Sequence, residues 1–387
     1  MIGREYPSEM FSYGDPLTGK EVIQLTKGEH NNYHIYFTDN SFDITDKYIY
    51  FLSDRSSKQR RIFNFFKMDL QTGRMVQITD EPDGIDYHTK TPDSEIIVFV
   101  SKNVLKKCNT KTGEITTLYA ETGNFKIESP FISPDKKYVG IVRNEIPKME
   151  RGGNYKGFKE QMFATKQSVI TLVYLDGSKV FDIYEVNHMC RHFQFSPDDS
   201  TVAMFCHEGP WHLVHQRIWI LDLVSRKAIP CFRQQEDDSV GHEFWTRDGL
   251  IFFDNRRKGH DGTITKDKTQ AILKDTIPDP DQKPYVGLAD RTGRVLKEIE
   301  MPYYCNHYHA NSRNDILIGD DADNLVAIDC RGEKARLITI CGHNTVWFDN
   351  RTHPHPTFSW NNQKILFASH KNDLIHLYLT EFDENSL

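Results

Sequence analysis

The chain lacks the sequence features that mark membrane, secreted and nucleic-acid-binding proteins. No stretch approaches the roughly 18 apolar residues of a membrane span, and the first seven residues contain no apolar run of the kind found in a secretory signal. Lys and Arg total 48 against 55 Asp and Glu, a net charge of -7, so there is no basic excess to bind a phosphate backbone. We therefore expect a cytoplasmic protein whose partners include neither membrane nor nucleic acid.

Cysteine is also scarce, and none of the seven cysteines forms a Cys-x-x-Cys pair. Their odd number and scattered positions are typical of reduced structural thiols and not of a disulfide framework or a zinc site. This pattern agrees with a cytoplasmic location. The seven are Cys108, Cys190, Cys206, Cys231, Cys305, Cys330 and Cys341.

What the chain does contain is a turn motif, Ser or Thr, any residue, then Asp or Asn, that recurs with a period of roughly 40 to 65 residues. A short β-rich run follows each copy, and further short strands follow that run, as expected for four-stranded propeller blades. The sequence therefore predicts a single domain over residues 1–387, an all-β, seven-bladed β-propeller. The copies are Thr91-Pro92-Asp93, Ser133-Pro134-Asp135, Ser196-Pro197-Asp198, Thr246-Arg247-Asp248, Ser312-Arg313-Asn314 and Ser359-Trp360-Asn361, with a degenerate first copy at Ile44-Thr45-Asp46.

The last blade lacks one strand at the C-terminal end, where the chain finishes shortly after residues 375–379. The missing strand is present at the other end, because residues 18–26 match residues 72–79 almost position for position. We expect the N-terminal strand to close the ring by pairing with C-terminal strands, which would remove two exposed strand edges.

Five repeats carry a histidine five or six residues before the final Asp or Asn of the turn motif. At about 3.3 Å per residue these histidines should lie some 15–20 Å from the turn, at the opposite end of the innermost strand. Recurrence of one titratable, metal-binding side chain at one repeat position indicates convergence on the mouth of the channel. They are His88, His192, His242, His309 and His355.

Loops that join the second and third strands of each blade should reach this same face. The longest run over about residues 144–167 and 255–283, and long loops in a compact repeat usually line or cover a site. Several loops are basic, which suits a small anionic ligand, although such charges are also common on solvated faces. The basic residues are Arg55, Lys58, Arg60, Arg61, Lys148, Arg151, Lys156 and Lys159.

The densest histidine cluster is Asn350-Arg351-Thr352-His353-Pro354-His355. Two histidines two residues apart point to the same side of an extended strand, and the run from His307 to His309 has the same pattern. The repeat register places His309 near His355. Two or three imidazoles with an amide or carboxylate oxygen suit Mn²⁺, Fe²⁺, Ni²⁺ or Zn²⁺.

A second cluster spans residues 207–217 and continues into residues 240–245. We expect Arg217 and His242 to face the mouth. A histidine can accept or donate a proton near neutral pH, and an arginine can pair bidentately with a carboxylate. The other interpretation, a strand-capping histidine and a structural ion pair, stays open at this point.

These segments resemble oligogalacturonate lyase, a family of pectin-degrading enzymes, and the resemblance covers essentially the whole chain. The family's fold is a seven-bladed propeller that binds Mn²⁺ through three histidines and a glutamine. The resemblance implies that His353 and His355 are ligands and that His309 is the third. It also places Asn350 at the glutamine position, where its side chain is one methylene shorter.

The resemblance further implies that His242 is the base and Arg217 the group that binds the substrate carboxylate in a β-elimination. The expected substrate is a small anionic oligosaccharide, a short galacturonate chain. Water or one of His192, His207 and His88 would protonate the leaving group, and we expect these histidines and Trp211 to contact the substrate.

Two other functions stay open, and a third is disfavoured. The chain could be a lyase on another uronate-containing oligosaccharide, or a non-catalytic propeller that binds a partner and no stoichiometric metal. A hydrolase is disfavoured because the sequence contains no Gly-x-Ser-x-Gly motif and no acidic pair at the blade openings. The oligomeric state is not readable from the sequence.

Overall fold

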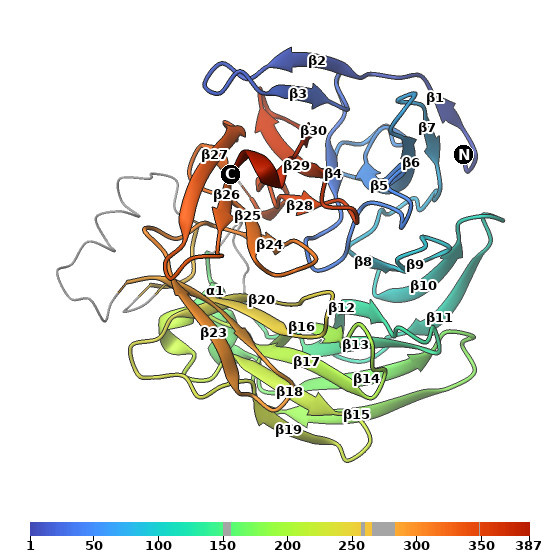
Figure 1. The fold of residues 1–387 in the computed structure, drawn as a ribbon. Coiled ribbons are helices and arrows are strands. Elements are labelled where there is room, and N and C mark those ends of the chain that lie inside the picture. Colours follow the sequence, from blue (N-terminus) through green and yellow to red (C-terminus); the bar gives the residue numbers. More distant parts are fainter. Residues whose placement is uncertain (150–155, 257–259, 265–282, 348) are drawn as a thin grey trace.

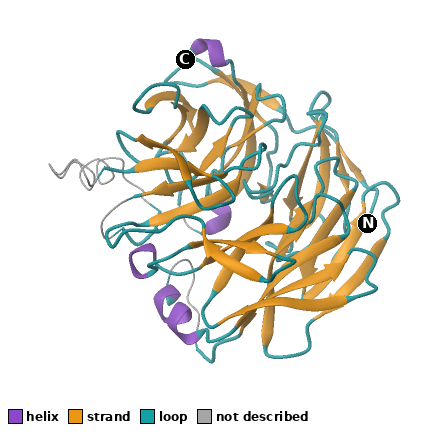
Figure 2. Cartoon of the chain, turned by 60° about the horizontal axis from the view of Figure 1, so that its bottom comes forward, coloured by secondary structure: helices purple, strands orange, loops and turns teal. Residues whose placement is uncertain are grey.

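A computed structural model of the chain describes residues 1–149, 156–256, 260–264, 283–347 and 349–387. These residues form seven antiparallel sheets arranged as a ring (Figure 1), which confirms the predicted seven-bladed propeller. Strands are the main regular element, and the few helical turns lie outside the sheets (Figure 2). No helix within the described ranges is long and apolar enough to cross a membrane.

Each sheet is one blade, with its first strand innermost. The first three blades are β4 (Asn32–His34), β5 (Tyr48–Ser53), β6 (Asn64–Asp69), β7 (Met75–Gln77); β8 (Tyr87–Lys90), β9 (Ile96–Ser101), β10 (Val104–Asn109), β11 (Ile115–Ala120); and β12 (Phe125–Ile132), β13 (Tyr138–Glu145), β14 (Ser168–Tyr174), β15 (Val180–Val186). The next three are β16 (Cys190–Phe195), β17 (Val202–His207), β18 (Ile218–Asp222), β19 (Lys227–Pro230); β20 (Val240–Trp245), β21 (Ile251–Asn255), β22 (Tyr285–Ala289), β23 (Val295–Glu300); and β24 (Tyr308–Ala310), β25 (Ile316–Asp320), β26 (Asn324–Asp329), β27 (Arg336–Gly342).

The seventh blade joins the two ends of the chain, as the sequence predicts. It contains β28 (Thr357–Phe358), β29 (Lys364–Lys371) and β30 (Leu374–Glu381), and β3 (Glu21–Gln24) pairs with β30 in the register Val22 to Thr380. Two N-terminal strands were not anticipated. β2 (Phe11–Gly14) extends the same blade, and β1 (Glu5–Tyr6) pairs with β7 of the first blade. The N-terminal segment therefore holds two neighbouring blades together.

Apolar side chains on the facing surfaces of neighbouring blades form the core. Val98 of the second blade packs with Ile127 and Val139 of the third, and all three are fully buried. Between the third and fourth blades, Gly140 lies against the ring of Phe193, where an added Cβ would come within 1.9 Å of a ring carbon. A side chain at position 140 would thus push the two blades apart. The seven cysteines are free and buried, as expected.

The segment after β4 fills the centre of the ring. Phe37 is 2% exposed, and its ring centroid lies about 6 Å from the rings of His242, His307 and His355. These three histidines come from three different blades. Phe37 therefore closes the channel beside them and forms an apolar wall of the site.

The loops between second and third strands carry the helical segments. α1 (Phe158–Ala164) follows β13, and the 3-10 turn η1 (Trp211–Leu213) follows β17. Met162 of α1 is buried with Met189 and Val214, which fixes the helix against the fourth blade. Both loops reach the same end of the ring as the starts of the inner strands, as the sequence predicts.

Candidate active site

The inner strands present equivalent side chains to the channel mouth through a repeated backbone feature. Ser129, His192, His242 and His355 each lie four residues before the Ser or Thr of the turn motif, and each has a positive φ between 44° and 53°. Strand pairing shifts register at the first three of these positions. Such β-bulges redirect a side chain and are common beside active sites. A left-handed backbone is costly for these residues, and strain of this kind is typical of functional positions.

In the sixth blade, the turn begins one residue earlier than the copy of the motif predicted from the sequence, Ser312-Arg313-Asn314. The Asn311 backbone N–H donates to the Ile316 carbonyl at 2.9 Å, as the Ser359 N–H donates to the Lys364 carbonyl in the seventh blade. Asn311 is therefore the first residue of this turn, and four residues earlier is His307. The structure places His307, and not His309, at the position equivalent to His242 and His355.

His307, His353 and His355 form a three-histidine cluster. One ring nitrogen of each lies within 4.8 Å of those of the other two. The Nδ1 of His307 lies 2.8 Å from Asp320 Oδ2, which fixes this ring and leaves Nε2 as the nitrogen available to a ligand. Metal-bound histidines usually have such a carboxylate partner on the other nitrogen. Asp320 was not singled out from the sequence.

The cluster fits a divalent transition-metal ion. Burial, followed by the neighbouring imidazoles, holds the pKa values of His307 and His355 well below the usual range. Both rings are therefore neutral, which is the form that binds metal. Three converging imidazole nitrogens are suited to Mn²⁺, Fe²⁺, Ni²⁺ or Zn²⁺.

Two residues predicted as ligands, His309 and Asn350, are not among the three clustered histidines. His309 is directed away from the cluster, since its Nδ1 accepts a hydrogen bond from the Phe358 N–H at 3.2 Å and its ring stacks near Phe244. Asn350 begins the 3-10 turn η3 (Asn350–Thr352), and its side chain lies outside the described part of the structure. The described residues suited to hold a metal at this place are therefore His307, His353 and His355.

His242 lies next to this cluster, as expected. Its ring centroid is 5.1 Å from that of His307 and 5.0 Å from the Trp211 ring, and its Nδ1 is 3.3 Å from Asp254 Oδ1. Burial lowers the pKa of His242, so the ring is neutral and able to accept a proton. Nε2 has no hydrogen-bond partner among the described residues and is the nitrogen left for a substrate.

Arg217 belongs to a closed network that the sequence did not predict. Its Nε donates to Glu243 at 2.9 Å and its Nη1 donates to Glu208 at 3.0 Å. The second oxygens of the two carboxylates face His192, at 2.9 Å from Nδ1 and 3.4 Å from Nε2. Burial acts to lower the pKa of Arg217, but Glu243 and then Glu208 outweigh it and raise that pKa. Arg217 therefore forms structural ion pairs, and its Nη2 donates to no described residue.

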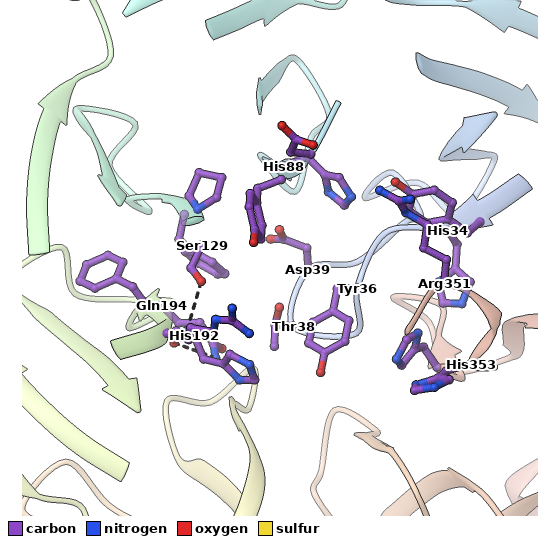
Figure 3. A pocket seen from close by; sticks show the side chains of 18 of the residues that line it. His34, Tyr36, Thr38, Asp39, His88, Ser129, His192, Gln194, Arg351 and His353 are labelled. Carbon is purple, nitrogen blue, oxygen red and sulfur yellow. Dashed lines mark hydrogen bonds between the residues drawn. The ribbon is translucent and has the colours of Figure 1, made fainter. Parts of the chain in front are cut away.

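Two connected cavities contain these groups. The smaller one, about 250 Å³, is lined by Arg217, His242, Trp211 and the three-histidine cluster. The larger one, about 550 Å³, is lined by residues of the first four blades and of the seventh, and is shown in Figure 3. Both are lined by five common residues, Tyr36, Arg191, His192, His353 and His355. The two cavities therefore adjoin along these five residues.

The remaining predicted residues are dispersed. His192 lines both cavities and His88 lines the larger one. The ring of His207 stacks on His188 at 3.9 Å, and His207 lines neither of the two cavities. Burial lowers the pKa values of His88 and His207 to about 4.

The basic loops contribute less free charge than the sequence suggested. Arg55 is buried and paired with Glu9 at 2.9 Å, and Arg61 is paired with Asp349 at 2.6 Å. Lys156 does line the smaller cavity. Arg151 lies outside the described residues.

Comparison with known proteins identifies relatives over the length of the chain. A family model described as oligogalacturonate lyase matches residues 1–272. An oligogalacturonide lyase of Pectobacterium atrosepticum is 26% identical, and an oligogalacturonate lyase of Dickeya dadantii is 24% identical. Each alignment covers 99% of this chain and 98% of the relative.

Two solved structures of similar fold belong to proteins with the same description. A structure of oligogalacturonate lyase in complex with manganese superimposes with a TM-score of 0.84 at 22% identity, over 99% of both chains. Oligogalacturonate lyase from Vibrio parahaemolyticus gives a TM-score of 0.85 at 21% identity, over 100% of both. These two structures have the same propeller fold as the present chain.

Proposed function

The chain belongs to the oligogalacturonate lyase family and is therefore a lyase; from this premise we propose that it cleaves short oligogalacturonides by metal-assisted β-elimination in the smaller cavity. The observation that carries the proposal is the meeting of three groups there: a neutral histidine, an arginine and a three-histidine cluster. These are the groups that removal of a proton next to a carboxylate requires.

We assign the metal site to His307, His353 and His355, and expect Mn²⁺ because a relative is described in complex with manganese. When bound there, a divalent ion supplies positive charge against the uronate carboxylate and the charge that develops on it during proton removal. Asp320 holds His307 in the required orientation. Asn350 stays a proposed fourth ligand, on the strength of its position in the family motif.

His242 is the proposed base. Its Nε2 accepts the proton from C5 of the uronate, the C–H electrons form the C4=C5 double bond, and the bond between C4 and its oxygen breaks. A positioned base of this kind typically contributes about 10²- to 10⁴-fold in rate. Replacement of His242 by Ala should abolish elimination and leave the metal content unchanged; equal turnover would remove His242 from this role.

Arg217 is the proposed carboxylate-binding cation. Two of its nitrogens are already bound to Glu243 and Glu208, so Nη2 is the one that can donate to the C6 carboxylate of the substrate. The two glutamates fix the guanidinium plane in advance, which lowers the entropic cost of binding.

His192 is the proposed donor of the proton to the departing oxygen. Among the three candidates from the sequence, it lies in both cavities, where the bond to be broken would sit. Both of its ring nitrogens face carboxylates, and both can donate only when the ring is protonated. A His192→Gln variant should lose kcat on digalacturonate while its metal content stays constant; an unchanged kcat would leave protonation to water.

The decisive test is turnover of digalacturonate by EDTA-treated protein, before and after addition of Mn²⁺, with elemental analysis of the untreated protein. Ultraviolet absorbance follows the unsaturated uronate, and mass spectrometry confirms the product because ring opening weakens the absorbance. Metal-dependent product would support the proposal. Bound metal without turnover would indicate another uronide, and absence of both metal and turnover would contradict the proposal.

A further inference from the structure

The larger cavity contains a cation that the proposed chemistry does not use. Arg351 follows the start of η3 and lines this cavity beside His34 and His353 (Figure 3). Its guanidinium carbon lies 5.0 Å from the ring centroid of Phe63 and 5.7 Å from that of Tyr33. The two aromatic rings hold the guanidinium in place, and Tyr33 also accepts a hydrogen bond from it, so the remaining N–H donors are the ones available to a ligand.

Arg351 differs from the other arginines of the site in its lack of a carboxylate partner. Arg217 has two carboxylates, and Arg191 is bound to Glu128 at 2.9 Å. No described carboxylate forms an ion pair with Arg351, and the acid nearest to it in sequence, Asp349, is neutralised by Arg61 at 2.6 Å. Arg351 therefore has a positive charge that no described carboxylate neutralises by an ion pair, and this charge can attract an anionic ligand.

The rest of the cavity suits an acidic sugar. Tyr36, Thr38 and Ser129 contribute hydroxyl groups to its lining (Figure 3). Lys126 and Arg191 line it as further cations. Lys126 lies 4.0 Å from Glu128, which it shares with Arg191. The volume of about 550 Å³ is within the usual range for small-ligand sites.

Besides Asp349, which is paired with Arg61, two acidic groups line the cavity, Asp39 and Asp86. Burial raises the pKa of Asp39 to about 7, which reduces its negative charge near neutral pH. Asp86 lies at the exposed rim, where solvent screens it. Neither of them forms an ion pair with Arg351 in the described structure, so the positive end of the cavity stays available.

We propose that the larger cavity binds the galacturonate on the leaving side of the cleaved bond, and that Arg351 binds its carboxylate. This inference rests on the proposed function. In a dimer, the residue that loses its C5 proton would fill the smaller cavity, and the only other residue is the one that leaves. The five residues common to both cavities include His192, the proposed donor to the oxygen between the two sugars.

The test compares two substrates, digalacturonate and the same dimer methyl-esterified only on its leaving-side carboxylate. An Arg351→Met variant keeps the apolar stem between the two rings and removes the charge. We expect kcat/KM for digalacturonate to fall about 10- to 100-fold, mostly through KM, as for loss of a charge-assisted hydrogen bond to a bound substrate. The value for the ester should change little.

Arg313→Met is the matched control, because Arg313 is exposed, paired with Glu384 and lines neither cavity. It should leave both substrates unaffected. Metal content and thermal midpoint of each variant check that Arg351→Met disturbs neither η3 nor the fold. Equal loss on both substrates, or no loss on digalacturonate, would overturn the assignment of Arg351.

Failure of the proposed function would be distinguishable from failure of this inference. If wild-type protein turned over neither substrate, the lyase proposal would fail. Calorimetric binding of digalacturonate would then still test the cavity: weaker binding by Arg351→Met than by Arg313→Met would support the carboxylate site, and equal binding by the two would overturn it.

Discussion

His307 and His309 lie two residues apart, yet only His307 belongs to the three-histidine cluster. Side chains two apart share a face only within a regular strand, and His307 precedes β24, where its N–H is bound to Asp320. We expect His307→Ala to weaken Mn²⁺ binding by more than about 100-fold, since loss of an outer-shell partner alone costs about 10- to 100-fold. His309→Ala should retain the metal.

Elemental analysis after dialysis, followed by Mn²⁺ titration of each variant, would decide between the two histidines. Loss of metal from His309→Ala with retention in His307→Ala would reverse the assignment. A thermal melt of both variants separates loss of a ligand from loss of the fold.

Arg217 gives a second prediction for a single residue. Removal of its charge leaves Glu243 and Glu208, which are 0% and 6% exposed, without their cation. We expect Arg217→Ala to lower the free energy of unfolding by about 3–5 kcal/mol, as for broken buried ion pairs. Arg217→Ala combined with Glu243→Gln should recover part of this loss. Urea unfolding of the single and double variants measures the coupling, and strictly additive effects would contradict the network.

Sequence reasoning located some of these residues and could not locate others. His353 and His355 are two apart and adjacent to the family motif, so spacing alone brought them together. The partners of Arg217 are 9 and 26 residues away in sequence, and only the packing of the fourth blade against the fifth brings them together. His307 could have been found by starting the sixth turn at Asn311, since His307 then lies four residues before the turn, as His242 and His355 do.

The inner strands obtain their function from an irregularity and not from their regular part. Ser129, His192, His242 and His355 adopt left-handed backbone conformations, which are uncommon for residues other than glycine. The sequence predicted the strands from their apolar runs and turns, but the bulges depend on strand pairing and were not predicted. The segment after β4 that places Phe37 in the channel was not anticipated either, because it belongs to no strand and its position depends on the packing of the whole ring.

Ring closure gives a prediction at the scale of one strand. Val22 of β3 is fully buried against the seventh blade, whereas Val224 is 77% exposed. We expect Val22→Ala to cost about 1–3 kcal/mol through lost burial and a residual cavity, and Val224→Ala to stay within about 0.5 kcal/mol. Chemical denaturation of both variants measures the difference. Equal stability would mean that β3 contributes little to closure.

The free energy of unfolding of the whole molecule should decrease in acid, because the fold buries neutral histidines. Burial lowers the pKa values of His343 and His376 to about 4, against roughly 6.5 in the unfolded chain. Between these values the unfolded chain binds more protons, so stability is complete above about pH 6.5 and falls as the pH decreases toward 4. At pH 5, each of these two histidines should lower the free energy of unfolding by about 2 kcal/mol relative to neutral pH.

Urea unfolding of metal-free protein at pH 7.5 and pH 5 would measure this effect. A His343→Asn variant should lose less stability than the wild type between the two pH values. His212→Asn is the control, because His212 is exposed. The same pH dependence in both variants would exclude His343 as a source of the acid sensitivity.

The architecture itself was the most predictable level. Seven turns at regular spacing, each followed by an apolar run, left few alternatives to a propeller. The matching segments at residues 18–26 and 72–79 indicated how the ring closes. β1 and β2 escaped notice because strands of 2 and 4 residues leave little periodic pattern to detect.

The pairing of β3 with β30 also orders events during synthesis. About 350 residues separate the two strands, so at about 5–20 residues per second β3 waits roughly 20–70 s on the ribosome for its partner. His307, His353 and His355 emerge in the same final portion of the chain. The ring therefore closes and the cluster assembles late, after most of the blades have had time to fold. A nascent chain stalled before residue 374 would expose an unsatisfied strand edge, which is a target for chaperones and for aggregation.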